Sequence, residues 1–351
     1  MAKVVTAMSG GVDSSVTAAL LIEQGHEVIG VHMKLHDAAP GQEPGNCCGL
    51  DDALDARRVA DRLGIPFYVM NLREAFQKSV MDNLVNTYLD GATPNPCIQC
   101  NGVLKFRVLL ARSLALGATH LATGHYARIN DDHQLMTAVD PDKDQSYFLF
   151  PVTQKALAKT LFPLGGMTKP EVREHARRFG LVTAEKAESQ DICFIPDNDH
   201  ARFVKETRPD FDASGDIVDE AGKVLGRHDA YYRFTIGQRR GLGVSLGYPA
   251  YVSHVDPKTK RVVVAPEERV RHHGLLATRA NWFDRPHPAR IVHVRIRHRG
   301  TLIPCTVSDG DPSEVTFLEP AHAVAPGQAA VFYDGDRVLG GGWITKALEN
   351  K

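Results

Sequence analysis

Two features of the chain combine residue types that could do chemistry: a glycine-rich loop near the N-terminus and three thiols further along. The loop Ser9-Gly10-Gly11-Val12-Asp13-Ser14-Ser15 follows the apolar run 4–8 and precedes a helix-like stretch at 16–24. Backbone N–H groups of paired glycines, together with the positive end of a helix, bind anions. The loop lacks the Gly-Lys-Ser/Thr ending of a Walker A motif, so it differs from the P-loop of kinases and GTPases. The sequence therefore predicts a phosphate pocket of another kind.

The thiols offer several kinds of chemistry. Cys97 and Cys100 form a C-x-x-C in the segment 91–101, which we expect to be a loop opened by two prolines, and Cys193 follows much later. A C-x-x-C alone indicates a redox pair, half of a zinc site or ligands of an iron–sulfur cluster. No second C-x-x-C exists in the sequence, which argues against a four-cysteine zinc site.

The other cysteines are expected to have no catalytic role. Cys47 and Cys48 are adjacent in a polar stretch, where we expect exposed or half-buried thiols without a catalytic role, and Cys305 follows Ile303-Pro304 as a small core residue. Six cysteines are too few and too scattered for a disulfide scaffold.

Alternating strand and helix patterns predict the elements around the glycine-rich loop. We expect strands at 4–8, 28–33, 66–72 and 119–123, and helices at 14–24, 51–63, 76–89 and 103–116. Repeated βα units imply an α/β fold with a doubly wound, mostly parallel sheet. Ligands in such sheets bind beyond the carboxyl ends of the strands. The Ser9 loop, Met33 and the Gly124-His125 turn all fall at that edge, so we expect one site there.

The pattern changes after about residue 150. We expect helices at 155–162 and 169–179, an extended loop at 185–195, and then short β runs at 222–226, 250–255, 261–265, 290–296 and 329–333. Turns rich in Gly, Pro and Asp separate these runs, which is typical of small β domains. The expected domains are an α/β domain with a helical extension at 1–200, a central β-rich domain at 201–276 and a C-terminal β-barrel at 277–351.

Composition sets further limits. A chain of 351 residues with 43% hydrophobic content is long enough for two or three domains, and its formal net charge of −1 excludes a uniformly basic surface. A nucleic-acid partner would have to bind local basic patches. The sequence contains no apolar run of about 18 residues and no secretion signal, so we expect a cytoplasmic protein without a membrane span.

A set of segments in fixed order carries a specific resemblance. They are 8–15, Asn95-Pro96, Cys100-Asn101, 122–126, 143–149, 192–195, 235–243, Pro326-Gly327-Gln328 and 339–342. In these segments the chain resembles the bacterial tRNA-specific 2-thiouridylase (MnmA) family, one of the PP-loop ATP pyrophosphatases, across essentially its whole length. Members of that family use ATP to replace the C2 oxygen of the wobble uridine by sulfur.

The resemblance implies a site for ATP. The C2 oxygen is a poor leaving group, so it is first adenylated, and pyrophosphate departs into the Ser9–Ser14 loop. Asp13 would organise Mg²⁺, which prefers oxygen ligands. The residues implied to bind ATP are Ala7, Met8, Ser9, Gly10, Gly11, Val12, Asp13, Ser14, Met33 and Gly124.

The resemblance also implies roles for the thiols, with two routes left open. In one, Cys193 carries the incoming sulfur as a persulfide, and Cys100 then acts on the S–S bond and ends as a disulfide with Cys193. In the other, Cys97, Cys100 and Cys193 hold a [4Fe–4S] cluster with one open iron. Cys97 stands where many family members have Asp, which favours the cluster route.

A tRNA partner would bind through local groups. Five arginines lie in 285–299, and we expect Arg295, Arg297 and Arg299 to share one face of a strand by period two. His298 stands where relatives have Tyr. The residues implied to contact tRNA are Asn95, Pro96, Cys97, His125, Lys143, Asp144, Gln145, Arg297, His298 and Gln328. A cysteine desulfurase or a sulfur-relay protein is the expected second partner.

Two other functions remain open at this stage. A PP-loop amide-forming ligase shares the adenylation step but has no use for paired thiols. A non-catalytic RNA-binding or cluster-binding protein would have no need of the intact Asp13, Ser14 and Ser15.

Overall fold

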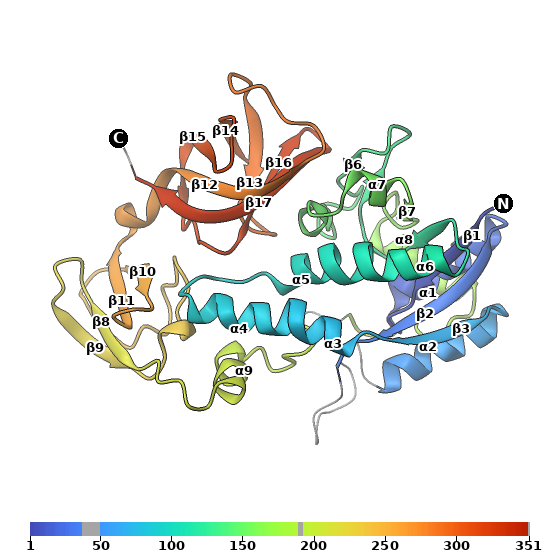
Figure 1. Cartoon of the computed structure of the whole chain (residues 1–351), viewed down its shortest axis with the longest axis horizontal. Coiled ribbons are helices and arrows are strands. Elements are labelled where there is room, and N and C mark those ends of the chain that lie inside the picture. The colour runs from blue at the N-terminus through green and yellow to red at the C-terminus, as the bar shows by residue number, and fades with distance from the viewer. Residues whose placement is uncertain (37–49, 189–191, 350–351) are drawn as a thin grey trace. The chain divides into compact units, whose positions relative to one another are not determined.

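The computed structural model describes residues 1–36, 50–188 and 192–349 (Figure 1). Cys47 and Cys48 lie outside the described residues. The chain divides into two compact units, which are considered separately below. The first comprises Met1–Met81, Cys97–Asn198 and Gly335–Val338, and the second comprises Asp82–Pro96, Asp199–Asp334 and the chain from Leu339 onward.

A parallel sheet forms the centre of the first unit. Its strands follow the order β3-β2-β1-β4-β7, with bounds Phe67–Asn71, Glu27–Lys34, Lys3–Ala7, His120–Ala122 and Thr160–Leu161. Each of these pairings is parallel. The chain runs outward from β1 to β3 and then returns to the other side of β1 at β4, which is the switch point of a doubly wound sheet. The expected fold class is therefore confirmed.

Helices bury the apolar residues of this sheet. The main ones are α1 (Val12–Glu23), α2 (Leu50–Leu63) and α8 (Lys169–Arg178), and their apolar side chains share one core cluster with β1, β2 and β4. Val16, Val59 and Val172 are fully buried in that cluster. The remaining helices are α3 (Arg73–Phe76), α5 (Pro96–Gln99), α6 (Leu110–Ala115) and α7 (Gln154–Leu157), the π-helices at Gln77–Met81 and Cys100–Leu109, and the 3₁₀ turn Ser146–Leu149. The hairpin β5 (Arg128–Ile129) and β6 (Leu135–Met136) completes the unit.

Two expected elements of the first unit were wrong. The segment 91–101 is not all loop, because α5 begins at Pro96 and continues into the π-helix, so Cys97 and Cys100 are helical. Proline is favoured in a first helical turn, where its missing N–H costs nothing. The helix expected at 155–162 ends at Leu157, and Thr160–Leu161 forms the edge strand β7. That strand is too short to give a periodic pattern.

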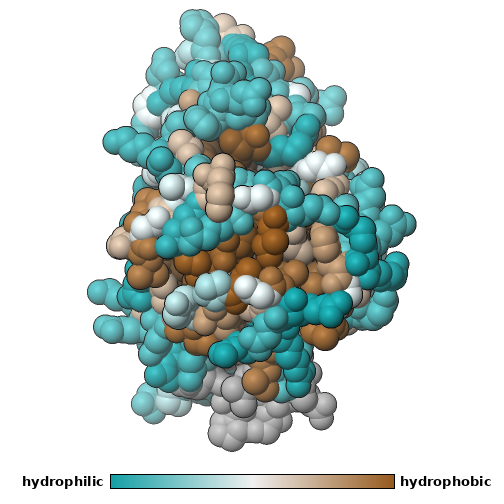
Figure 2. Space-filling model, turned by 90° about the vertical axis from the view of Figure 1, so that its right-hand side faces the viewer, coloured by the Kyte–Doolittle hydropathy of each residue, from teal (hydrophilic) through white to brown (hydrophobic). Residues whose placement is uncertain are grey.

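The edge strand β3 leaves some apolar surface uncovered. Tyr68 and Val69 are each more than half exposed. Figure 2 shows a face on which apolar side chains gather in the middle and hydrophilic ones surround them. Exposed apolar atoms are ordinary on folded proteins, and we assign no ligand to them.

The second unit is rich in strands, as expected. It contains α4 (Asp82–Leu89), α9 (His200–Thr207) and the 3₁₀ turns Tyr231–Arg233 and Glu267–Val270. A four-stranded sheet follows the order β10-β11-β8-β9, with bounds Ala250–Asp256, Arg261–Pro266, Gly215–Val218 and Val224–His228. The C-terminal strands are β12 (Arg271–Trp282), β13 (Val292–Arg295), β14 (Ile303–Val307), β15 (Ser313–His322), β16 (Ala329–Asp334) and β17 (Arg337–Leu348). They pair in the order β12-β15-β14-β13-β16-β17, and β12 also pairs with β17, which closes a barrel.

The core of this barrel explains the last cysteine. Cys305 is fully buried on β14, between Val292 of β13 and Phe317 of β15, and it belongs to the barrel's hydrophobic cluster. The expectation of a small core residue is confirmed.

The expected row of arginines on one strand face was wrong. Strand β13 ends at Arg295, and Arg297 and Arg299 lie in the bend and turn that follow. A hydrogen bond of 3.0 Å from Gly300 N to Arg297 O closes that turn, so the period-two pattern does not extend past residue 295.

Across the three ranges that the model describes, no helix combines the length and apolarity needed to cross a membrane.

Two glycines bring separate elements against the start of α1. Gly10 has a φ of +85°, and a Cβ there would lie 2.2 Å from the carbonyl oxygen of Asp52 on α2. A Cβ at Gly124, after β4, would lie 2.9 Å from the carbonyl carbon of Asp13. At both glycines the backbone lies closer to a neighbouring segment than a residue with a Cβ would allow.

We predict that Gly10→Ala lowers the free energy of unfolding by about 2–4 kcal/mol, through left-handed strain and the clash with α2. Gly25 is the matched control, because its φ of +81° is similar but nothing lies within 4 Å of its Cβ position. Gly25→Ala should cost only about 1 kcal/mol. Urea unfolding followed by circular dichroism measures both, and equal losses would contradict the close approach.

Candidate active site

The loop Ser9–Ser15 has the form of an anion site. Helix α1 begins at Val12, and its N-cap, Gly11, makes no side-chain hydrogen bond to the helix, which leaves the first N–H groups for another acceptor. The hydroxyl of Ser14 instead stabilises the loop, since it accepts from Ser9 N at 3.1 Å and donates to Gly11 O at 3.0 Å. The hydroxyl of Ser15 also donates to Gly11 O, at 2.9 Å.

The expected ATP residues surround this loop. Ala7 and Met8 are buried at the end of β1, Met33 lies near the end of β2, and Gly124 follows β4. These strands are neighbours in the order β2-β1-β4, so their carboxyl ends meet at one edge of the sheet. The structure thus brings together the segments that the sequence predicted to converge.

A buried lysine forms an ion pair with the carboxylate of Asp13. Lys169, at the start of α8, is 7% exposed, and its Nζ donates to both oxygens of Asp13 at 2.7 and 2.9 Å. The hydroxyl of Tyr126 donates to the same carboxylate at 2.8 Å. Burial and the negative charge of Asp13 raise the pKa of Tyr126 well above its ordinary value, so the phenol remains a donor.

The charge network continues from Lys169 to a second acid. Glu188 lies 3.3 Å from Lys169 Nζ and accepts from Lys143 Nζ at 2.8 Å. Burial raises the pKa of Glu188, but the hydrogen bond from Lys143 and the charge of Lys169 outweigh that effect and hold it below the ordinary value. Two ammonium groups and two carboxylates therefore lie beside the loop.

Sequence reasoning missed this network. Tyr126 lies in the segment 122–126 that carries the resemblance, and Lys169 begins an expected helix, but the sequence indicates no role for either side chain. The sole signal for Lys169 was the capping box of Thr168 and Glu171, which fixes the start of α8 and hence the place of Lys169.

Asp13 does not fit the expected role of a preformed Mg²⁺ ligand. Both of its carboxylate oxygens already accept hydrogen bonds from Lys169. No group of three or more His, Cys, Asp or Glu side chains within the described part of the chain could hold a metal ion. That finding concerns a metal ion and does not test a larger cluster, so a [4Fe–4S] cluster at Cys97, Cys100 and Cys193 stays a prediction.

The three thiols differ in their exposure to solvent. Cys97 is exposed, whereas Cys100 and Cys193 are half-buried. Phe194 anchors the segment after Cys193, because its ring packs edge-on against Phe76 of α3 with centroids 5.3 Å apart. Burial raises the pKa of Cys100 to about 12, the charge of Lys105 opposes this shift, and Cys193 and Cys97 add to it. Cys100 therefore lies within electrostatic reach of both other thiols.

The residues expected to contact tRNA in the first unit have internal partners. Asp144 is buried and accepts from Ala138 N, Ser146 N and the Ser146 hydroxyl. The side chain of Gln145 accepts from Tyr126 N at 3.0 Å. His125 is 7% exposed and bonds Lys105 and Thr123. Their contact with tRNA stays a prediction.

The second unit brings two distant segments together. The side-chain amide of Gln328 donates to the carbonyls of Thr93 and Pro94 at 3.2 and 3.1 Å, and its oxygen accepts from Asn95 Nδ2 at 3.5 Å. Gly327, with a φ of +90°, allows the contact, because a Cβ there would lie 2.7 Å from Thr93 O. Gln328 therefore holds the loop that carries Asn95 and Pro96.

Arg297 and His298 lie elsewhere in this unit. Arg297 is exposed and donates to the carbonyl of His322 at 2.8 Å. Within the ranges that the structure describes, no carboxylate forms an ion pair with it. In contrast, Arg290 pairs with Asp334 at 2.6 Å and Arg285 with Asp309 at 3.5 Å. His298 follows Arg297 in the same turn and is half-buried.

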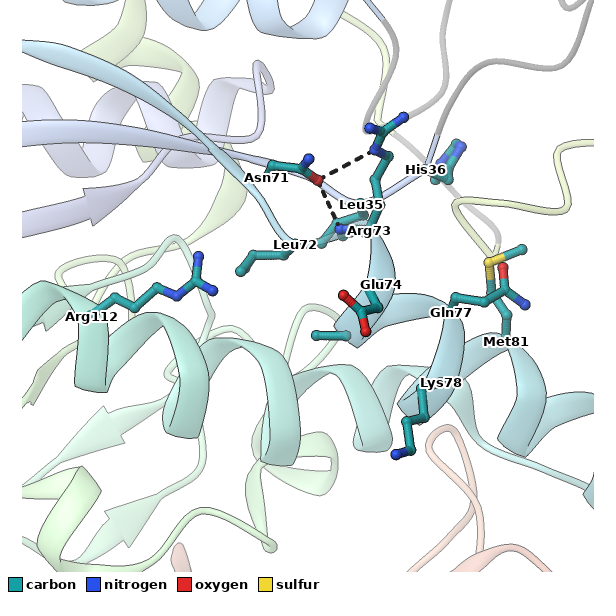
Figure 3. A pocket seen from close by; sticks show the side chains of 11 residues that line it. Leu35, His36, Asn71, Leu72, Arg73, Glu74, Gln77, Lys78, Met81 and Arg112 are labelled. Atoms are coloured by element: carbon teal, nitrogen blue, oxygen red, sulfur yellow. Dashed lines mark hydrogen bonds between the residues drawn. The ribbon is translucent and has the colours of Figure 1, made fainter.

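A cavity of about 830 Å³ lies near the ends of β2 and β3 (Figure 3). Its lining includes three cations, Arg73, Lys78 and Arg112, and one acid, Glu74. Asn71 Oδ1 accepts from Arg73 N at 3.2 Å and from Arg73 Nε at 3.3 Å. None of the expected site residues lines this cavity.

Comparisons with known proteins agree with the geometry. Three family models match the chain: the tRNA methyl transferase HUP domain over residues 2–197, the tRNA methyl transferase PRC-barrel domain over 201–266 and the aminomethyltransferase beta-barrel domain over 272–344. The tRNA-specific 2-thiouridylase MnmA of Geotalea uraniireducens is 54% identical over 99% of this chain and 96% of its own length. The chain belongs to the MnmA family.

A second MnmA protein is also similar to this chain over nearly its whole length. The MnmA protein of Geobacter metallireducens is 52% identical over 99% of this chain and 97% of its own length. Among solved structures, a 4-thiouridine synthetase in complex with RNA and bound ATP aligns with a TM-score of 0.39 and 17% identity, over 60% of this chain and 51% of that chain. That likeness is too weak to assign anything.

We predict that Lys169→Met lowers the free energy of unfolding by about 1–3 kcal/mol, because it leaves the Asp13 carboxylate without its counter-charge in a partly buried place. The control is Arg178→Met, which removes a cation of the same helix whose pairing with Glu23 is half exposed on both sides. The control should change stability little. Matched urea titrations compare the two, and an Arg178→Met loss as large as that of Lys169→Met would contradict the buried pairing.

Proposed function

We propose that this chain replaces the C2 oxygen of a tRNA wobble uridine by sulfur, using ATP and the thiols of Cys100 and Cys193. The proposal is carried by one observation: the loop expected to bind ATP and the cysteines expected to transfer sulfur lie in one compact unit of the chain. The Ser9–Ser15 loop and the two cysteines belong to the same compact unit of the chain, and Cys193 is close enough to Cys100 to raise the pKa of its thiol. Membership of the 2-thiouridylase family supports the same reaction.

The adenylation step uses the sheet edge. The C2 oxygen attacks the α-phosphate of ATP, and pyrophosphate leaves with the bonding electron pair. The first-turn N–H groups of α1, a helix without a side-chain cap, are suited to bind that pyrophosphate. Lys169 adds a positive charge next to the loop, and its pairing with Asp13 keeps it in place. The adenylated oxygen can then depart as AMP.

The sulfur step uses the thiols. A persulfide on Cys193 attacks C2, AMP leaves, and the thiolate of Cys100 attacks Cys193 Sγ. The S–S bond to the transferred sulfur breaks, its electron pair remains with the sulfur on C2, and Cys100 and Cys193 form a disulfide. An external dithiol reduces that disulfide before the next turnover. A [4Fe–4S] cluster held by Cys97, Cys100 and Cys193 is the alternative proposal, and we derive no step through it.

The remaining assignments are proposals as well. We propose that the 1–200 domain binds ATP and that the 201–276 and 277–351 domains help to hold tRNA, with Arg297 as one phosphate contact. A cysteine desulfurase or a sulfur-relay protein as sulfur donor and a cytoplasmic location stay predictions.

Replacing either thiol should separate the two steps. We predict that Cys100→Ser and Cys193→Ser lose at least about 10³-fold in 2-thiouridine formation, because serine can neither carry nor release sulfur. Both variants should keep tRNA-dependent pyrophosphate release. Labelled pyrophosphate and nucleoside analysis of the product tRNA measure the two steps. An amide-forming ligase would keep full turnover in both variants, and that result would overturn the proposal.

A second test concerns tRNA binding. We predict that Arg297→Ala weakens tRNA binding about 3- to 30-fold and lowers the slope of log affinity against log salt by about one, because one phosphate contact is lost. Arg290→Ala is the control, since Asp334 already neutralises that arginine. Filter binding at several salt concentrations measures the slopes. An unchanged slope in Arg297→Ala would contradict the contact, and ATP affinity should be the same in both variants.

A further inference from the structure

The loop 235–243 belongs to the segments that resemble the MnmA family, but the proposed reaction gives it no role. It follows the 3₁₀ turn Tyr231–Arg233 and precedes β10. Arg239 and Arg240 are adjacent in this loop, and both are exposed. Within the ranges that the structure describes, neither guanidinium forms a hydrogen bond or an ion pair. Exposed cations that gather without counter-charges are typical of a surface that binds a polyanion.

Hydrogen bonds fix the backbone that carries these two arginines. The side chain of Gln238 accepts from Thr235 N at 3.1 Å and donates to Arg240 O at 3.0 Å. The backbone also pairs with β10, since Gly237 N donates to Val252 O at 2.8 Å and Val252 N donates to Gln238 O at 2.9 Å. A loop that is ordered before a ligand arrives loses less conformational entropy when it binds.

The loop packs against the C-terminal barrel, which belongs to the same compact unit. Gly237 has a φ of +84°, and a Cβ there would lie 2.2 Å from the Cβ of Ala323, in the turn after β15. The residue before it, His322, accepts through its carbonyl from the guanidinium of Arg297 at 2.8 Å. The loop of the central domain and Arg297 of the barrel therefore contact two consecutive residues.

The acid among these cations is already paired. Arg271 forms an ion pair with Glu267 at 2.9 Å, and its hydrogen bond holds the pKa of Glu267 below the ordinary value, with a further contribution from the charge of Arg239. Burial lowers the pKa of His322, and the charge of Arg297 lowers it further. Arg239 and Arg297 thus act on neighbouring groups of one surface, and Glu267 does not neutralise either of them.

We propose that Arg239 and Arg240 bind phosphates of the tRNA backbone together with Arg297, so that one RNA strand spans the central domain and the barrel. The inference deepens the proposed function and rests on it for the identity of the polyanion as RNA. A guanidinium can donate two parallel hydrogen bonds to one phosphate. Phosphate contacts fix the orientation of a nucleic acid and carry no sequence information. These arginines therefore orient the tRNA without reading its bases.

The test is tRNA binding by the full-length chain with Arg239→Gln and Arg240→Gln combined, measured by filter binding at several salt concentrations. We expect affinity at low salt to fall about 10- to 100-fold and the slope of log affinity against log salt to fall by about two, because two phosphate contacts are lost. Adding Arg297→Ala should lower the slope by about one more. ATP affinity should not change.

The matched control combines Arg227→Gln and Arg269→Gln. Both are exposed arginines of the central domain, but Arg227 pairs with Asp216 at 3.5 Å and Arg269 with Glu220 at 2.7 Å. The control should keep the wild-type slope. If circular dichroism shows that the Arg239 and Arg240 double variant does not fold, the two single variants replace it, each with an expected loss of about one in slope.

An unchanged slope would overturn the proposal, even if affinity fell, because a disturbed fold lowers affinity without removing a phosphate contact. An unchanged slope with weaker binding of a sulfur-relay protein would also overturn it and would assign the surface to an acidic protein partner. The binding assay needs no turnover. A lowered slope in a chain that binds tRNA but forms no 2-thiouridine would therefore support this inference and overturn the proposed function alone.

Discussion

The close packing of backbones around the first turn of α1 is the constraint on which the rest of the site depends. Asp52 of α2 approaches Gly10 on one side, and the turn after β4 approaches Asp13 and Ser14 through Gly124 on the other. Neither approach leaves room for a Cβ. The loop is therefore fixed by contacts with elements that are distant in sequence, which suits the pyrophosphate site that we propose for it.

The charged side chains around that loop form ion pairs with one another. Glu188 lies between Lys169 and Lys143, Lys169 also pairs with Asp13, and Tyr126 gives Asp13 a further donor. Each buried charge has a partner, as the cost of burying an isolated charge requires. The thiol of Cys100 differs, because its surroundings disfavour the charged form that the chemistry needs. A neutral resting thiol resists oxidation.

Much of the first unit could be predicted from the sequence, because its strands and helices have clear periods and its loop has a known chemistry. The elements that escaped prediction are those decided by tertiary contacts. The π-helix after Pro96 has no periodic signature, and β7 is two residues long. The arginine pattern at 295–299 extends beyond Arg295, where strand β13 ends and the chain enters a turn. A buried lysine such as Lys169 looks like any other helix residue until its partner Asp13 is placed.

The nucleoside content of tRNA tests the central claim most directly. In a strain from which this protein has been removed, mass spectrometry of digested tRNA should show no 2-thiouridine at the wobble position. The intact chain should restore it, and the chain with Cys100→Ser should not. An undiminished level of 2-thiouridine in the deleted strain, or full rescue by Cys100→Ser, would contradict the account.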